Sequence, residues 1–530
     1  MPTFAVQKRK KHIISKTYVL KIMYKQFLSV TALTMGLAAA TMFTACSDNN
    51  TPEDPASQYH WSENGGLKAC DNILFENGTQ IGNGDNEFVF TGKQTLKKGT
   101  YLLKGWVYVA DGAELTIEPG TVIKGDKQTM AALIVERGGK LFAQGAQNAP
   151  IVFTSEEAKG HRRPGDWGGL ILCGKAPHNA GEAQIEGGPR TKHGGNDVHD
   201  NSGVLSYVRV EFAGYPFEKD KEINGITFGS VGDGTKVDHL QVSYSNDDSY
   251  EWFGGTVNCK NLIAFRGWDD DFDTDNGFSG HVQYGLAVRD SRIADVSQSN
   301  GFESDNDASG STAQPYTSAT FSNITFVGPK ASDDAFQNTN SYINAGSSFP
   351  NNGSALGLFQ AAMQIRRGSR LNCVNSVAMG WPIGLMLDGE KGDTQKQATD
   401  GHIMLRNVWF GGMTLTGSDA NKLYQDNLVT GYDSSKKPIV DDTKPSFSTT
   451  WFLQQPGNRA DASTASWLLQ PLAGLSGVNI LPAAGSPLLS AGSFSGITSS
   501  WFDQVNFIGA FGTDNWTMGW ANFDPQNTDY

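Results

Sequence analysis

Acidic side chains crowd into one short stretch near the middle of the chain. Five aspartates fall within seven positions, namely Asp269, Asp270, Asp271, Asp273 and Asp275. Carboxylates this close together raise one another's pKa or recruit a cation. Oxygen ligands in a flexible loop are the kind that Ca²⁺ prefers. The stretch is not an EF-hand, because Gly277 falls at position seven of the loop instead of six and no helices flank it.

Further acids lie about one repeat before and after this stretch, and stacked repeats would bring all of them to one edge. Glu251 belongs to the earlier group. The predicted ligands of Ca²⁺ or another hard cation are Asp247, Asp248, Asp269, Asp270, Asp271, Asp273, Asp275, Glu303, Asp305 and Asp307. The alternative is that they are solvated turn residues, since Asp and Asn cap bends by bonding their own backbone.

Aromatic residues accompany the acids. Trp252 and Trp268, with Arg266, are candidate ligand-binding residues, because exposed indole rings form platforms on which sugar rings stack. Buried, the same rings would be ordinary stacks in a hydrophobic core.

Catalytic residues cannot be assigned from the sequence. A polysaccharide lyase would need a base near the metal, and Arg266, Arg289 or His281 could supply it. The sequence has no Gly-His-Gly, Arg-Ile-Lys or HExxH motif and no phosphate-binding loop. We therefore expect a protein without enzymatic activity, with a polysaccharide lyase or glycoside hydrolase as the alternative.

The composition and the repeats indicate a solenoid of short strands. Glycine is frequent (62 of 530 residues), and the net charge of −13 argues against a nucleic-acid partner. Trp106–Leu115 aligns with Ala132–Leu141 at an offset of 26, and Val237–Gly255 with Cys259–Gly277 at an offset of 22. Asn276-Gly277-Phe278 recurs as Asn300-Gly301-Phe302 at an offset of 24. This period favours an all-β, right-handed parallel β-helix over a β-sandwich.

The N-terminal segment has the pattern of an export signal. A basic start is followed by an uncharged, apolar run from Phe27 to Ala45, which ends at Cys46. The run resembles a bacterial lipobox, which implies acylation (palmitate) at Cys46 and a lipid anchor in a membrane. A transmembrane helix is the alternative, although six Ser, Thr and Gly residues dilute the run. Met23 is a second candidate start site.

Four cysteines remain after Cys46, and none of them has metal-ligand spacing. Cys259 and Cys373 lie in similar Asn-Cys contexts, which predicts small core residues of strands. The sequence does not assign any disulfide among Cys70, Cys173, Cys259 and Cys373.

Several longer motifs resemble a known family. They include Pro164-Gly165-Asp166-Trp167-Gly168-Gly169, Glu251-Trp252-Phe253-Gly254-Gly255, Gly301–Asp307 and Ile508-Gly509-Ala510-Phe511-Gly512. These stretches resemble outer-membrane lipoproteins common in Bacteroidetes, related to a leptospiral outer-membrane lipoprotein and often labelled "multidrug transporter". The resemblance implies an outer-membrane, surface-exposed protein. A transporter is not expected, because no second apolar run could span a bilayer.

These observations predict a pectin-lyase-like solenoid with a non-repeating C-terminal cap. The expected segments are a signal peptide at 1–45, a tether at 46–66, a β-helix at 67–400, and C-terminal coils with a cap at 401–530. The expected role is to bind a glycan, a matrix or a partner protein, with Ca²⁺ as the stabilising ion. An accessory role beside an outer-membrane transporter is a further alternative.

Overall fold

The computed structural model describes residues 59–61, 67–69, 74–75, 80–85, 87–218, 221–344, 357–417, 428–435, 438–441 and 446–530. Cys46 and Cys70, and most of the predicted tether, lie outside these residues. Within the described part of the chain, no helix is both long enough and apolar enough to cross a bilayer.

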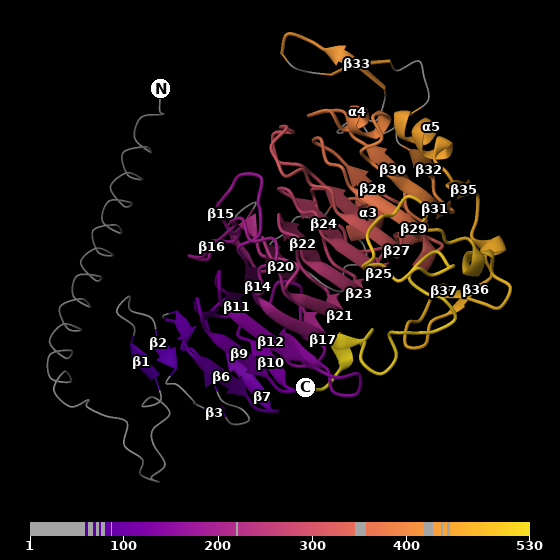
Figure 1. Cartoon of the computed structure of the whole chain (residues 1–530). Coiled ribbons are helices and arrows are strands. Elements are labelled where there is room, and N and C mark those ends of the chain that lie inside the picture. The colour runs from indigo at the N-terminus through magenta and orange to yellow at the C-terminus, as the bar shows by residue number, and fades with distance from the viewer. Residues whose placement is uncertain are drawn as a thin grey trace, which may run out of the picture. The chain divides into compact units, whose positions relative to one another are not determined.

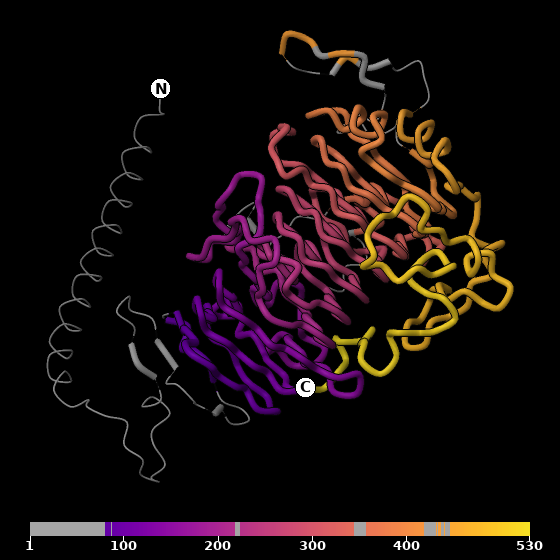
Figure 2. The backbone as a smooth tube through the Cα atoms, in the orientation of Figure 1, coloured from indigo at the N-terminus to yellow at the C-terminus, as the bar shows by residue number. Residues whose placement is uncertain are grey.

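Two long sheets, here named sheet A and sheet B, run side by side through stacked coils (Figures 1 and 2). All strand pairings between coils are parallel in the described residues, and β1 with β2 forms an antiparallel start. Sheet A consists of β1 (Tyr59–Trp61), β2 (Leu67–Ala69), β5 (Phe88–Phe90), β8 (Trp106–Val109), β11 (Ala132–Val135), β14 (Gly169–Cys173), β20 (Ile226–Gly229), β22 (Tyr250–Phe253), β24 (Phe272–Asp275), β26 (Phe302–Ser304), β28 (Ala361–Ile365), β30 (Ile383–Leu387) and β32 (Leu415–Gly417).

Sheet B changes character along the stack. Its main path is β3 (Leu74–Phe75), β6 (Lys93–Leu96), β9 (Glu114–Ile117), β12 (Lys140–Gln144), β17 (Gly203–Glu211), β21 (Lys236–Ser243), β23 (Asn258–Phe265), β25 (His281–Val288), β27 (Thr320–Val327), β29 (Asn372–Met379), β31 (Leu405–Gly411) and β35 (Arg459–Asp461). Early coils add a third strand, which is β4 (Gln80–Ile81), β7 (Thr100–Leu103), β10 (Val122–Gly125) or β13 (Ile151–Ser155). Strand β17 pairs with both β12 and β13, so from there one long strand replaces two short ones.

A left-handed residue bends each of these long strands at the same level. The bends lie next to one another in the stack. On both sides of each bend, the strand residues pair with the corresponding residues of the neighbouring coil. The aligned residues, here named the bend ladder, have φ between 50° and 64°: Tyr207, His239, Asn261, Tyr284, Asn323, Asn375 and Asn407. Asparagine adopts this conformation more readily than most residues, because its short side-chain amide can form hydrogen bonds with the nearby backbone.

Register confirms two of the predicted repeats and corrects the third. Trp106 pairs with Ala132 at offset 26, and Val237 pairs with Cys259 at offset 22. The offset of 24 is wrong, because Phe302 pairs with Phe272 at an offset of 30. Asn276 and Gly277 form a turn after β24, whereas Asn300 and Gly301 lead into β26, so the two Asn-Gly-Phe motifs are not equivalent.

Short hairpins and helices interrupt the coils. The hairpins are β15 (Ala183–Gln184) with β16 (Lys192–His193), β18 (Pro216–Glu218) with β19 (Lys221–Glu222), β33 (Leu428–Tyr432) with β34 (Pro438–Asp441), and β36 (Leu469–Pro471) with β37 (Asn479–Pro482). The helices are α2 (Pro329–Ser332), α3 (Asn340–Asn344), α4 (Thr394–Thr399), α5 (Phe447–Gln454), η2 (Ala465–Trp467), η3 (Pro487–Ser490) and η4 (Pro525–Asn527). Strand β1 falls inside the predicted tether, so the strands begin before residue 67.

The last part of the chain, residues 468–530, is here named the C-terminal strap. It was expected to cap the last coil, but it turns back along the outer face of sheet B (Figure 1). The backbone N–H of Gly509 donates to Asn375, and that of Asn522 donates to the side chain of Gln241. Gly160 then donates to the carbonyl of Gln526, so the strap reaches the early coils. Under it lies a second hydrophobic core, separate from the one inside the coils.

Candidate functional site

Strand alternation places carboxyl groups on the outer face of sheet A. In β22, Tyr250 and Trp252 belong to the core inside the coils, and Glu251 between them points the other way. In β24, Phe272 belongs to the same core, and Asp273 takes the outward position. Glu251 and Asp273 are register partners on adjacent strands, so they are neighbours on that face.

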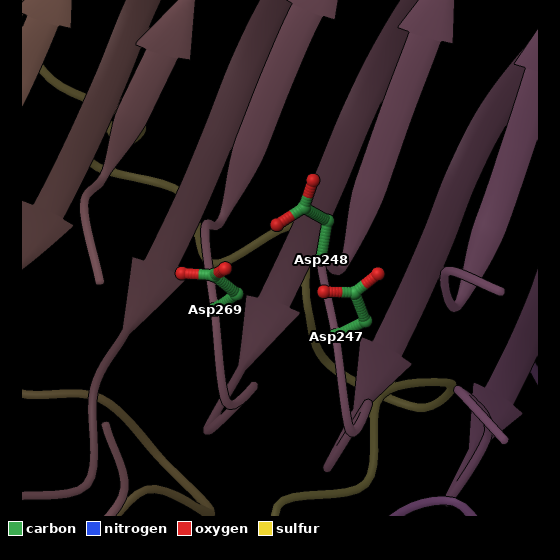
Figure 3. A group of neighbouring side chains, drawn as sticks. All are labelled: Asp247, Asp248 and Asp269. Atoms are coloured by element: carbon green, nitrogen blue, oxygen red, sulfur yellow. The ribbon is translucent and has the colours of Figure 1, made fainter. Parts of the chain in front are cut away.

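The loops that precede these two strands bring further acids to the same place. Asp248 and Asp270 each lie two residues before their strand, and the N–H of Asp270 donates to Oδ1 of Asp248 over 2.8 Å. Figure 3 shows Asp247 and Asp248 on one loop and Asp269 on the adjacent loop. Parallel stacking at an offset of 22 is the reason that these two loops adjoin.

Five carboxyl groups therefore form what we name the acidic cluster: Asp247, Asp248, Glu251, Asp269 and Asp273. Oxygen atoms of Asp247, Asp248 and Asp269 lie within 4.8 Å of one another, as do those of Asp248, Glu251 and Asp273. Asp248 is common to both groups. Each group could hold one cation through oxygen ligands alone, which is the donor set that Ca²⁺ prefers.

Burial and mutual repulsion disfavour ionisation of this cluster. Burial, and then the nearby Asp247 and Asp273, raises the pKa of Asp248 well above its ordinary value. Burial and then Glu251 do the same for the pKa of Asp273. The pKa of Asp269 rises to about 8, first through burial and then through Asp295. A bound cation would favour the ionised forms of all of these groups.

Unsatisfied oxygen atoms point to a ligand beyond the protein itself. Oδ1 of Asp273 and Oδ1 of Asp269 are buried and accept no hydrogen bond from the described residues. Buried polar atoms normally have a partner, so each such oxygen calls for an explanation. One cation in each group would satisfy these oxygens, Asp269 in the first group and Asp273 in the second.

The remaining predicted ligands are used elsewhere. Asp271 forms a fully buried ion pair with Arg289 over 2.9 Å. Glu303 pairs with Arg366, and Asp305 pairs with both Arg366 and Arg367. The others accept bonds from backbone N–H groups of nearby residues, namely Asp270 from Asn300, Asp275 from Asn276, and Asp307 from Ser309 and Ser311. These six acids therefore have partners within the protein, and the groups with metal-ligand spacing contain the other four predicted acids together with Glu251.

The indole rings of Trp252 and Trp268 are not surface platforms for sugars. Trp252 is 0% exposed and stacks on Phe228 and Phe278 inside the coils. Trp268 is 1% exposed and belongs to the second core, so the core alternative holds for both. Arg266 follows β23 of sheet B and donates to the hydroxyl of Tyr244 over 3.0 Å.

The three candidate bases lie in or directly after strands of sheet B, and one of them, Arg289, contacts the acidic cluster by donating to the backbone carbonyl of Asp269 over 2.7 Å. Arg289 is 1% exposed and is paired with Asp271. His281 begins β25 of sheet B and packs against Phe502 of the C-terminal strap, with ring centroids 4.9 Å apart. The third candidate, Arg266, follows β23 of sheet B and donates to Tyr244. No catalytic residue follows from these positions.

The cysteines of the described residues are buried, free thiols: Cys173, Cys259 and Cys373. Cys259 and Cys373 lie in the core inside the coils, as predicted. Burial raises the pKa of Cys173 and Cys373 to about 12, so these thiols stay protonated at neutral pH.

Sequence reasoning missed a cleft beside the acidic cluster. Its wall includes Trp106, Glu186, His193 and Phe253, and the loop around β15 and β16 forms one side. The signal in the sequence was the long insertion between β14 and β17, which interrupts the regular period. Its contacts are not readable from the sequence, because they join residues far apart in the chain.

The comparison with protein families agrees with this architecture. The family model "Pectate-lyase like beta helix domain" matches residues 89–467. A crystal structure of pectate lyase Pel9A matches with 13% sequence identity and a TM-score of 0.36, over 81% of this chain and 88% of that one. No curated protein matches the chain.

Proposed function

Because the chain belongs to the pectate-lyase-like β-helix domain family, we propose that it is a binding module without catalytic activity that holds Ca²⁺ at the acidic cluster. One observation carries the proposal: two overlapping groups of carboxyl oxygens, each within 4.8 Å, share Asp248. The cation would in turn bind carboxylate groups of an acidic glycan.

Electrostatics favours a cation at this place. Two like unit charges 4.8 Å apart repel by roughly 3 kcal/mol at an effective dielectric constant of about 20. A divalent cation between such carboxylates replaces this repulsion with attraction, and one cation in each group would give the buried oxygens of Asp269 and of Asp273 a partner. Because Ca²⁺ takes about six to eight oxygen ligands, the cluster leaves positions for water and for a ligand's carboxylate.

The arginines near the cluster favour binding over catalysis. A lyase needs an available base beside its metal ion. In the described residues, Arg366 and Arg367 are paired with Glu303 and Asp305, and Arg289 is paired with Asp271. Because their guanidinium groups are held in these ion pairs, the three arginines are not available as the catalytic base of a lyase.

A thermal melt with EGTA and then with excess Ca²⁺ tests the proposed cation site. Saturation at a concentration about 100 times Kd would stabilise the fold by about 2.7 kcal/mol. We expect a rise in Tm of the wild-type protein that is lost in Asp248→Asn, because Asp248 belongs to both groups of carboxyl oxygens. Mg²⁺ is the control, because this smaller ion requires a nearly ideal octahedron of ligands, which the open acidic cluster does not offer. Equal Tm values with and without Ca²⁺ would contradict the proposal.

The N-terminal sequence supports a proposed location. We infer that Cys46 is acylated and that the protein is a Bacteroidetes-type lipoprotein at the outer surface of the outer membrane. The support is the basic start, the apolar run to Ala45 and the polar residues after Cys46. Expression of Cys46→Ser tests it, because this variant should leave the membrane fraction whereas wild type stays. Membrane retention of both proteins would overturn the lipid anchor.

A further inference from the structure

A second cleft, here named the Gln360 cleft, lies at the edge of sheet A where three neighbouring strands begin. It has a volume of about 600 Å³. Gln360 directly precedes β28, Pro382 directly precedes β30 and Thr414 directly precedes β32, and all three residues line the cleft. The N–H of Ile383 donates to the carbonyl of Gln360 over 3.2 Å, and the N–H of Leu415 donates to that of Pro382 over 3.0 Å. Hydrogen bonds between coils therefore fix this part of the lining.

The side-chain amide of Gln360 is buried and has no partner. Gln360 is 1% exposed, and neither its Oε1 nor its Nε2 takes part in a hydrogen bond with the described residues. A buried amide normally has partners, because losing its hydrogen bonds to water costs free energy. One acceptor and one donor are thus available side by side in the lining of the cleft.

Trp381 adds a second donor. Its side chain is 1% exposed and lines the cleft, and its Nε1–H has no acceptor in the described part of the chain. The amide of Asn338 in the same lining differs, because it accepts from the N–H of Phe359 over 3.0 Å and donates to the carbonyl of Phe359 over 2.8 Å. The cleft therefore contains one amide that the protein itself uses and one, that of Gln360, that it does not.

The rest of the lining is largely apolar and uneven. Phe336, Leu358 and Leu415 are partly exposed there. The rings of Phe336 and Phe359 meet edge to face, with centroids 5.6 Å apart, and the ring of Trp381 stands at 81° to that of Phe359. These described side chains suit the C–H groups of a puckered ring, and they do not form the parallel pair of rings between which a flat nucleobase would stack.

The amide of Gln360 selects among polar ligands. A carboxylate has acceptors alone, so it would leave Oε1 of Gln360 unpaired. The C=O and N–H of a trans peptide or acetamido group point in opposite directions, so one such group cannot meet both atoms of the amide. Two adjacent hydroxyl groups can, because one donates to Oε1 while its neighbour accepts from Nε2–H.

We propose that the Gln360 cleft binds a sugar ring through two adjacent hydroxyl groups that pair with the amide of Gln360. The indole N–H of Trp381 donates to a further oxygen of the same sugar, and the C–H groups of the ring pack against Phe336 and Leu415. The inference does not rest on the proposed cation site, because none of these residues belongs to the acidic cluster.

An NMR titration in EGTA tests the Gln360 cleft without the cation. The probes are methyl β-glucoside, methyl β-galactoside and methyl α-mannoside, each compared with its 3-deoxy analogue. Loss of the 3-hydroxyl leaves the ring intact but removes every pair of adjacent hydroxyl groups. We expect at least one parent glycoside to bind, and its 3-deoxy analogue to bind about tenfold more weakly, or by about 1.4 kcal/mol. Absence of binding for all three parents, or equal binding of a parent and its analogue, would overturn the inference.

Gln360→Met separates binding from folding. Methionine is unbranched and has no amide, so glycoside binding should be lost while Tm equals or exceeds that of wild type, because a buried amide without partners is removed. Gln241→Met is the matched control, since the amide of Gln241 is also buried but is bonded to both the N–H and the carbonyl of Asn522. This control should lower Tm and keep glycoside binding. A lower Tm for Gln360→Met, or unchanged binding by it, would overturn the inference.

Trp381→Phe is a second variant that keeps an aromatic ring in place and removes the N–H. It should weaken binding of the parent glycoside by about tenfold, and an unchanged affinity would contradict the role given to Trp381. Failure of the proposed function is separate, because it would appear as no Ca²⁺ effect on the Tm of unliganded wild type.

Discussion

At the level of single residues, the acidic cluster makes stability depend on pH in a defined direction. The carboxyl pKa values of Asp248, Glu251 and Asp273 are raised by burial and then by neighbouring acids, and that of Asp269 reaches about 8. The folded protein therefore binds more protons than the unfolded chain between about pH 4 and pH 8. Stability contributed by these protonated groups is lost as the pH rises through that window.

In EGTA, we expect the urea midpoint of unfolding to fall from pH 5 to pH 8. With Ca²⁺ the fall should be smaller, because the cation stabilises the ionised carboxylates. The Ca²⁺ increment, which is the rise in the urea midpoint that Ca²⁺ causes, should therefore grow with pH. The double variant Asp248→Asn/Asp273→Asn is the control. In EGTA, its urea midpoint should depend less on pH than that of wild type. An increment that is largest at pH 5 would contradict the account.

Two neighbouring aspartates separate stability from cation binding. Asp271→Asn leaves Arg289 buried without its partner, which costs about 3–5 kcal/mol of unfolding free energy. Asp273→Asn removes a proposed ligand, one oxygen of which accepts no hydrogen bond from the described residues, and should cost far less unfolding free energy in EGTA. We expect Asp271→Asn to keep the whole Ca²⁺-dependent gain in unfolding free energy, and Asp273→Asn to lose the share that comes from the group of Asp248, Glu251 and Asp273. Urea unfolding of both variants with and without Ca²⁺ measures this, and the reverse pattern would exclude Asp273 as a ligand.

At the level of elements, the bend ladder explains how a three-strand coil becomes a two-strand coil. Asn323 has a φ of 59°, donates from Nδ2 to the carbonyl of Phe507 and accepts at Oδ1 from Gln283. Asn323→Ala should lose about 2–4 kcal/mol, of which about 1–2 kcal/mol is backbone strain. Asn323→Gly loses the same hydrogen bonds without the strain.

The difference in the free energy of urea unfolding between Asn323→Ala and Asn323→Gly therefore measures the backbone strain at position 323. Glycine should be no worse than alanine at position 323, whereas in ordinary strand positions it is the worse residue. An alanine variant as stable as wild type would show that the bend contributes little. Asn407→Ala, at the last and only partly buried position of the ladder, is the control and should cost less unfolding free energy than Asn323→Ala.

The repeat could be predicted wherever matching residues have equivalent positions. Val237 and Cys259 are each the second residue of a sheet B strand, so the offset of 22 found their pairing and also aligned Asp248 with Asp270. The Asn-Gly-Phe repeat failed because the same three residues serve a turn in one coil and a strand start in the next. Local composition cannot tell these two uses apart.

The candidate site was only partly predictable. Acid spacing located the cluster, but Arg366 and Arg367 are more than sixty residues from the acids that they neutralise. The cleft joins Trp106 to Phe253 through an insertion of irregular length. Partners at that separation leave no periodic signal, so neither the smaller ligand set nor the aromatic wall could be derived from the sequence.

At the level of the whole β-helix, the two sheets have separate tasks. The C-terminal strap covers the outer face of sheet B, and the acidic cluster lies on sheet A. Trp520 is 1% exposed and packs edge to face against Tyr207 and His239. Trp520→Ala removes a contact of about 3–5 kcal/mol, so the end of the strap should detach more often.

Limited proteolysis followed by mass spectrometry measures this detachment. We expect Trp520→Ala to be cut faster within residues 501–530 while its Ca²⁺ increment in Tm stays that of wild type. Trp501→Ala, a partly exposed residue of the same strap, should resemble wild type. A lost Ca²⁺ increment in Trp520→Ala would mean that the strap and the cluster are coupled.

Ca²⁺ binding itself is the most direct test of the central claim. Isothermal titration of the cation-free protein with CaCl₂ should give saturable binding that Asp248→Asn abolishes, because Asp248 belongs to both groups of carboxyl oxygens. Asp307→Asn, which alters an acid that caps a turn away from the cluster, should bind as wild type does. Absence of saturable binding in wild type, or equal binding in Asp248→Asn, would contradict the account.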